Sequence, residues 1–104
     1  MAKDDYFVIA YKILKYFYTC LKSDQDPDIN MYNANAFNIN QSYWDYIMVN
    51  LFEYGYISDL LIIPPTLGRK RKGVRVLDST MITPDGIKYL EENSMFQRFK
   101  QEGI

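Results

Sequence analysis

The spacing of apolar residues predicts an amphipathic helix at the start of the chain. Over residues 4–22 apolar side chains recur at steps of three and four, which places them along one side of a helix. This stripe consists of Tyr6, Ile9, Ala10, Ile13, Phe17 and Leu21, and it is widened by Phe7, Leu14 and Tyr18. We therefore expect a first helix that is buried on more than one side.

A second helix is predicted over residues 41–54, where the apolar seam is narrower. Its seam is formed by Trp44, Ile47, Met48 and Leu51. Asn40 is suited to the N-cap, and Gly55 is suited to the left-handed position that ends many helices. The opposite, solvent-facing side is expected to carry Ser42, Tyr46, Val49 and Glu53, flanked by Asp45 and Asn50.

The segment between these helices has a mixed pattern. Residues 23–28 are acidic and contain Pro27, which predicts a loop. Residues 30–40 hold five Asn, a residue that favours turns and caps. Interspersed apolar residues nevertheless indicate a short helix from Ile29 to Ala36 and a turn through Asn40, with a short strand over residues 37–39 as the alternative.

A β-hairpin is predicted over residues 56–82. Residues 56–63 are rich in apolar and β-branched side chains, and Pro64 and Pro65 end that strand. Residues 74–82 resume the pattern with a bulge or bend at Asp78–Ser79. Thr83, Pro84 and Asp85 then form a strong helix start, with Ile87 and Leu90 on the inner side. Met95 and Phe96 are assigned to the core, and the roles of Phe99 and Ile104 stay open.

Charge is distributed unevenly, although the net charge is only −1. No Lys or Arg occurs between Ser23 and Gly68, and that stretch carries six acidic residues. A basic turn follows at once, formed by Arg69, Lys70, Arg71, Lys72 and Arg75. Such asymmetry indicates a polarised surface.

Composition excludes most enzyme classes. The chain of 104 residues has no His and one Cys, so ordinary zinc sites and His-dependent nucleophiles are excluded. Cys20 is interpreted as a small buried hydrophobe. The glycines are isolated and form no phosphate loop, and Asp24, Asp26 and Asp28 lack the rest of a calcium loop. We expect no enzyme activity and no cofactor.

The length favours one domain over residues 1–104. The amino-terminal residues carry acids where a signal peptide would be basic. The longest apolar run, Leu60–Pro65, is far shorter than the roughly 20 residues that span a bilayer. These features favour a cytoplasmic protein with no membrane partner.

The order helix, short helix, helix, strand, basic turn, strand is that of an α+β winged helix-turn-helix, with a three-helix core, a two-stranded wing and an additional C-terminal helix. The run from Ile82 to Leu90 resembles the entry into the helix after the wing in bacterial regulators of the MarR and PadR types. The whole chain resembles more closely the YjcQ-like family of small bacterial and phage-associated winged-helix proteins. The positions that carry this second resemblance are Gly55, Tyr56, Ile57, Thr83, Gly86, Tyr89, Leu90, Glu92 and Asn93. The resemblance implies the winged-helix fold and little about activity.

The basic turn gives the best indication of function. Cations between two glycines are suited to follow a phosphate backbone, because each contact releases condensed counterions. The alternative is a solvated hairpin tip that protects a strand edge. The candidate wing residues are Arg69, Lys70, Arg71, Lys72 and Arg75.

The helix expected to read bases is less suited to the task. Residues 41–54 contain no cation and carry Asp45 and Glu53. Neutral hydrogen bonds to base edges are left to Gln41, Ser42, Tyr43, Tyr46 and Asn50.

Two functions stay open. One is a DNA-binding accessory regulator of bacterial or phage origin that contacts the backbone of duplex DNA through its basic wing. The other is a protein-interaction or adaptor domain that uses the Tyr-rich acidic surface around Tyr43, Tyr46 and Glu53. A homodimer through the first and last helices is compatible with both.

Overall fold

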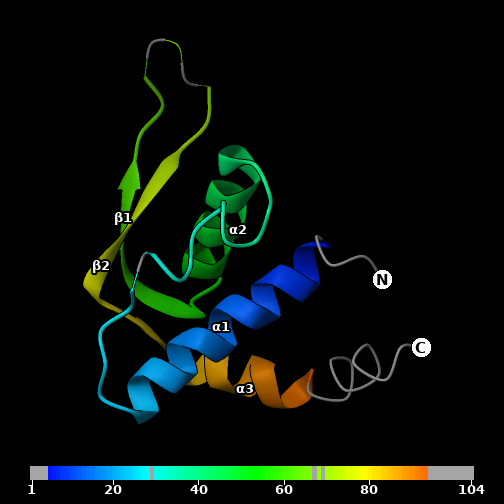
Figure 1. Ribbon diagram of the computed structural model, residues 1–104, viewed down its shortest axis with the longest axis vertical. Helices are drawn as coiled ribbons and strands as arrows, with labels where there is room; N and C mark the ends of the chain where they lie inside the picture. The colour runs from blue at the N-terminus through cyan, green and yellow to red at the C-terminus, as the bar shows by residue number, and fades with distance from the viewer. Residues whose placement is uncertain (1–4, 29, 67, 69, 94–104) are drawn as a thin grey trace.

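The computed structural model describes residues 5–28, 30–66, 68 and 70–93. Helix α1 (Tyr6–Lys22) is followed by helix α2 (Gln41–Glu53), strands β1 (Ile57–Ile63) and β2 (Gly73–Ile82), and helix α3 (Pro84–Glu92). The strands form a two-stranded antiparallel sheet. In Figure 1 the hairpin stands beside α2, and α1 crosses below α2 and lies next to α3. This is an α+β, winged-helix-like arrangement with a C-terminal helix, as predicted.

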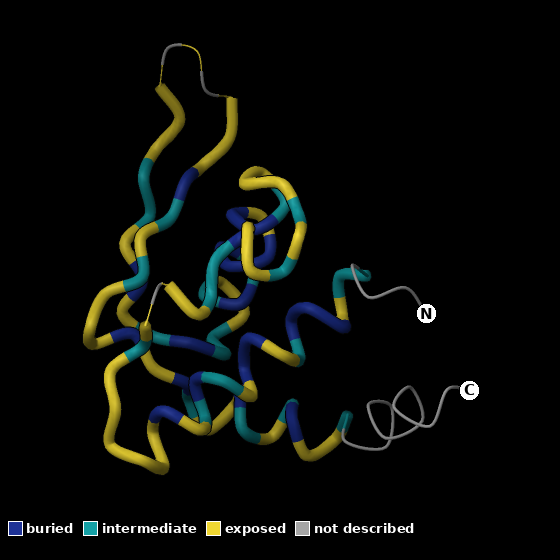
Figure 2. The backbone as a smooth tube through the Cα atoms, viewed as in Figure 1, coloured by how far each residue is buried: buried dark blue, intermediate teal, exposed yellow. Residues whose placement is uncertain are grey.

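The core lies where the two long helices meet the base of the hairpin. The buried side of α1 packs against the predicted seam of α2, and the strands and α3 close the remaining sides (Figure 2). The buried apolar side chains in this cluster include Ile9, Ile13, Phe17, Trp44, Ile47, Met48, Leu51, Ile57, Leu60, Ile82 and Leu90. The first stripe was wrong at its edges: Leu21 and Phe7 are exposed. Phe7 is the second residue of α1 and Leu21 the second-last, so both lie at ends of the helix.

Residues 30–40 form turns, and the predicted short helix is absent from the described part of this segment. Asn33 accepts a hydrogen bond from the backbone N–H of Ala36 (2.8 Å), and Asn38 adopts a positive φ of 60°. Asn side chains that bond nearby backbone compete with the helical ladder. The strand alternative at residues 37–39 is also wrong, and Ile29 lies outside the described residues.

The predicted caps are confirmed. Asn40 accepts from the Tyr43 N–H at 2.8 Å, and Gly55 has a φ of 79°. Thr83 caps α3 by accepting from the Gly86 N–H at 3.2 Å. These contacts satisfy helix-end backbone groups that have no partner within the helix.

The predicted irregularity at Asp78–Ser79 is also confirmed. Ser58 pairs with Met81 and Leu60 pairs with Val76, so one residue of β1 lies opposite four residues of β2. The buried Thr80 fixes this bulge, because its hydroxyl donates to the carbonyl of Asp59 and accepts from the N–H of Leu77. The bulge separates the base of the hairpin from the regular ladder that leads to its tip.

The predicted tail contacts of Met95, Phe96, Phe99 and Ile104 lie outside the described residues. Within the described part of the chain, no helix is long and apolar enough to cross a membrane.

Candidate nucleic-acid interface

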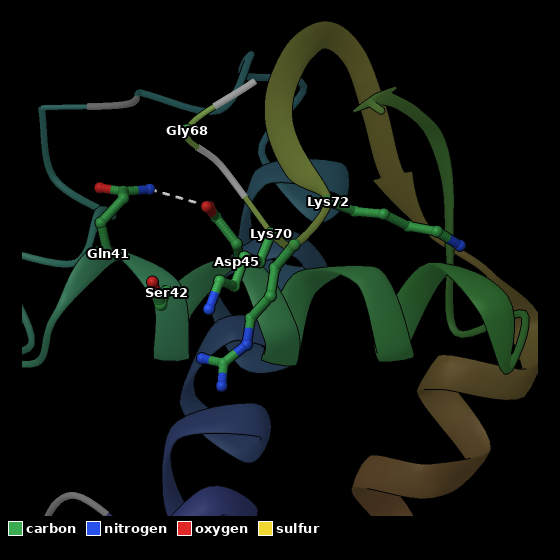
Figure 3. Close-up of a pocket in the computed structure, with 7 residues that line it drawn as sticks. Gln41, Ser42, Asp45, Gly68, Lys70 and Lys72 are labelled. Atoms are coloured by element: carbon green, nitrogen blue, oxygen red, sulfur yellow. Dashed lines mark hydrogen bonds between the residues drawn. The ribbon is translucent and has the colours of Figure 1, made fainter. Parts of the chain in front are cut away.

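The tip of the hairpin and the first turns of α2 enclose a hollow of about 360 Å³. The wing contributes cationic side chains to its wall, and α2 contributes polar side chains and one carboxylate (Figure 3). The lining residues are Gln41, Ser42, Asp45, Gly68, Lys70, Arg71 and Lys72. The structure thus brings three of the predicted wing residues together with two of the predicted α2 residues.

The wing lies close against α2. Lys72 donates to Glu53 at a Nζ–Oε2 distance of 3.2 Å, and it also lines the hollow beside Asp45. Asp45 and Glu53 lie two turns apart on α2. Lys72 reaches from the hollow beside Asp45 to Glu53. In Figure 3 the Lys72 side chain extends along the helix, away from Asp45.

The predicted solvent-facing side of α2 needs correction. Asp45 is only 5% exposed and Val49 only 8% exposed. Val49 lies between Asp45 and Glu53, one turn from each, on the side of α2 along which Lys72 extends. Helical spacing alone assigns this side to solvent. The spacing of residues within α2 could not predict this burial, because it depends on the hairpin that packs against the helix.

Both carboxylates of α2 have partners. Gln41 donates through Nε2 to Oδ1 of Asp45 at 2.8 Å (Figure 3), and Glu53 accepts from Lys72. The Lys72–Glu53 pair is half exposed on both sides, so it contributes at most about 1 kcal/mol. Lys72 therefore compensates the charge of Glu53, whereas Gln41 is neutral and leaves the charge of Asp45 in the wall of the hollow.

The first turn of α2 places the amino-terminal end of a helix beside the cations. Asn40 caps only part of that turn, by accepting from the Tyr43 N–H. The positive end of the helix dipole favours anions near Gln41 and Ser42. The hollow thus combines cationic side chains of the wing with the amino-terminal end of a helix.

Two of the predicted α2 residues lie elsewhere. Tyr46 is 58% exposed and makes an edge-to-face contact with Tyr6 of α1, with ring centroids 6.2 Å apart. Asn50 hydrogen-bonds the Tyr6 hydroxyl, which opposes the rise in the pKa of Tyr6 that burial causes. Both side chains face the amino-terminal end of α1 and are absent from the lining of the hollow.

Tyr43 and Arg75 are also absent from that lining. Tyr43 is half-buried and packs on the core. Arg75 pairs with Leu61 between Val74 and Val76, which both pack on the core, so its side chain lies on the outer face of the hairpin. Arg69 lies outside the described residues.

Sequence reasoning missed the participation of Gly68 and Asp45 in this site. Gly68 has a φ of 87°, which lets the chain turn at the tip. Asp45 follows Gln41 by four residues, and that spacing is a recognisable signal for a side-chain pair on a helix. The Lys72–Glu53 contact has no such signal, because it depends on the strand register.

The fold and the site together define a winged-helix-like domain with a basic hollow between its wing and its second helix. The family model described as YjcQ protein matches residues 11–101, and the chain belongs to this family. Comparison with curated proteins and with solved structures gives no match.

Proposed function

We propose that this protein binds duplex DNA through the phosphate backbone, as an accessory transcriptional regulator of bacterial or phage origin that acts in the cytoplasm and has no enzyme activity. The observation that carries the proposal is the convergence of Lys70, Arg71 and Lys72 with the first turn of α2 around one hollow. Cationic side chains gathered beside the amino-terminal end of a helix suit a phosphate.

The same geometry argues against strong base readout. Most of the polar side chains on α2 that could reach base edges are engaged or turned away, because Gln41 binds Asp45 and Asn50 binds Tyr6. Base-specific recognition relies on donors and acceptors presented to the groove. We therefore expect salt-sensitive binding with little sequence preference.

The direct test is fluorescence anisotropy with a labelled duplex at low salt. The double variant Lys70→Gln/Arg71→Gln removes two wing cations and leaves the Lys72–Glu53 pair in place. The control Lys12→Gln/Lys15→Gln removes the same charge from the exposed face of α1. The wing variant should bind at least tenfold more weakly, since two charge-assisted contacts are lost, and the control should bind like the wild type. Undetectable binding by the wild type, or equal loss in both variants, contradicts the proposal.

The adaptor function is supported by a different observation. Tyr46 and Tyr54 are exposed on the α2 side of the molecule, near Glu53. Exposed tyrosines are enriched at protein interfaces. Light scattering of the wild type and of Tyr46→Ser/Tyr54→Ser tests whether these tyrosines mediate self-association. If the wild type and the variant are both monomeric, self-association through this surface is excluded.

A further inference from the structure

Helix α1 carries a second basic surface that the proposed function does not use. Lys12, Lys15, Thr19 and Lys22 are exposed and recur at steps of three and four, so they share one side of the helix. Over this span α1 is about 15 Å long. The surface is distinct from the wing in sequence and in position.

This surface faces away from the wing. The opposite side of α1 carries Ile9, Ile13 and Phe17, which pack in the core with α2 and the hairpin. A ligand in the hollow at the tip of the wing therefore does not reach the lysine side of α1. The two basic surfaces are available to two different partners.

Two open hollows lie on this surface and share Lys15 and Thr19 as a common wall. One, of about 300 Å³, lies between α1 and α3 and is lined by Tyr11, Tyr18, Lys22, Leu90 and Glu91 in addition to the shared wall. The other, of about 280 Å³, is lined by Lys12, Tyr16 and Tyr32 in addition to the shared wall. The surface thus alternates apolar depressions with ammonium groups.

The tyrosines here are engaged with each other and with Lys22. The rings of Tyr16 and Tyr32 stack with centroids 3.7 Å apart, and the Lys22 ammonium lies 4.4 Å from the centre of the Tyr18 ring. Binding of single-stranded nucleic acid relies on ring faces that bases can stack on. Apolar depressions also offer no favourable contact to the charged groups of a phosphate backbone. Both observations favour a protein partner over a nucleic acid.

We propose that the surface formed by Lys12, Lys15, Thr19 and Lys22 binds an acidic amphipathic segment of a protein partner. Leucine-like side chains of that segment occupy the two hollows, and its carboxylates pair with the three lysines. The three lysines outnumber the carboxylate of Glu91, so charge favours an acidic partner. The two hollows lie on either side of Lys15 and Thr19, which favours a segment that crosses α1 over a small molecule.

The experiment uses a labelled amphipathic peptide with leucines on one side and glutamates beside them, and a matched peptide in which every glutamate is glutamine. The wild type should bind the acidic peptide and bind the glutamine peptide at least tenfold more weakly. Lys12→Gln/Lys15→Gln should weaken binding of the acidic peptide about fivefold, since two partly exposed ion pairs are lost. Lys70→Gln/Arg71→Gln carries the same charge change and should leave peptide binding unaltered.

Thr19 provides a second variant within the shared wall. Thr19→Glu places a carboxylate between the two hollows and should abolish peptide binding, whereas Thr19→Ala should retain it. Equal effects of the α1 and wing double variants on the peptide overturn the proposal, because they reduce it to non-specific charge attraction. Loss of duplex binding in Lys12→Gln/Lys15→Gln also overturns it, since the surface would then serve nucleic acid. The peptide result is independent of whether the wing binds DNA, so the two proposals fail separately.

Discussion

The base and the tip of the β1–β2 hairpin are held in different ways. At the base, the backbone N–H of Thr83 donates to Tyr56 O at 3.0 Å, and the Thr83 hydroxyl donates to the carbonyl of Gly55. At the tip, the described residues are mostly exposed, and Lys72 joins the tip to α2 through its half-exposed pair with Glu53. The base is fixed by partly buried backbone hydrogen bonds, whereas the tip is held by charge that salt weakens. Fold stability is therefore expected to reside at the base, and ligand binding at the tip.

The largest expected effect tests the base. Gly86→Ala should destabilise the fold by about 3 kcal/mol, because an added Cβ would lie 2.3 Å from the Tyr56 carbonyl oxygen and 2.7 Å from the Ile82 side chain. The measurement is urea unfolding. Gly55→Ala is the matched control: it is strained by its φ of 79° but meets nothing within 4 Å, so it should lose only about 1 kcal/mol. Equal losses in the two variants would show that close approach at Gly86 is unimportant.

A smaller effect is expected from Thr83. Thr83→Ala removes the cap of α3 and the hydrogen bond to the Gly55 carbonyl, and should lower the free energy of unfolding by about 1–2 kcal/mol. Thr83→Ser keeps the hydroxyl and should recover most of that loss in the same unfolding assay. If serine is no better than alanine, the hydroxyl does not join α3 to the end of α2.

The stability of the base is also expected to depend on pH in the alkaline range. Burial, followed by the neighbouring Tyr56, raises the pKa of Tyr89 above its ordinary value of 10.0. Above that value the unfolded chain releases the phenol proton while the folded chain keeps it, so stability falls as pH rises through 10. Tyr89→Phe should reduce the fall in unfolding free energy between about pH 9 and about pH 11. An unchanged fall would assign the pH dependence to other groups.

The smallest effect on stability is expected at the tip. Glu53→Gln should change the unfolding free energy by less than about 0.5 kcal/mol, because its pair with Lys72 is exposed to solvent. The same change frees Lys72 and should raise duplex affinity about two- to fivefold. Glu92→Gln on α3 makes the same change in net charge away from the wing. An equal gain in affinity there would assign the effect to net charge alone.

The contrast between base and tip also explains what the sequence could predict. Asn40, Gly55 and Thr83 act on backbone within a few residues, so their caps could be read from local patterns. The turns of residues 30–36 were missed because the bond from Asn33 to nearby backbone outweighs the apolar residues beside it, whereas the turn through residues 37–40 was predicted. The burial of Asp45 and Val49 and the Lys72–Glu53 pair depend on where the hairpin lies over α2, which no local pattern encodes.

The salt dependence of duplex binding tests the central claim most directly. In a plot of log affinity against log salt concentration, each phosphate contact contributes a slope of about −0.9. Lys70→Gln/Arg71→Gln should therefore make the slope less negative by about 1.8, while Lys12→Gln/Lys15→Gln should leave it unchanged. A slope that is the same in the wild type and the wing variant would contradict a phosphate site in the hollow between the wing and α2.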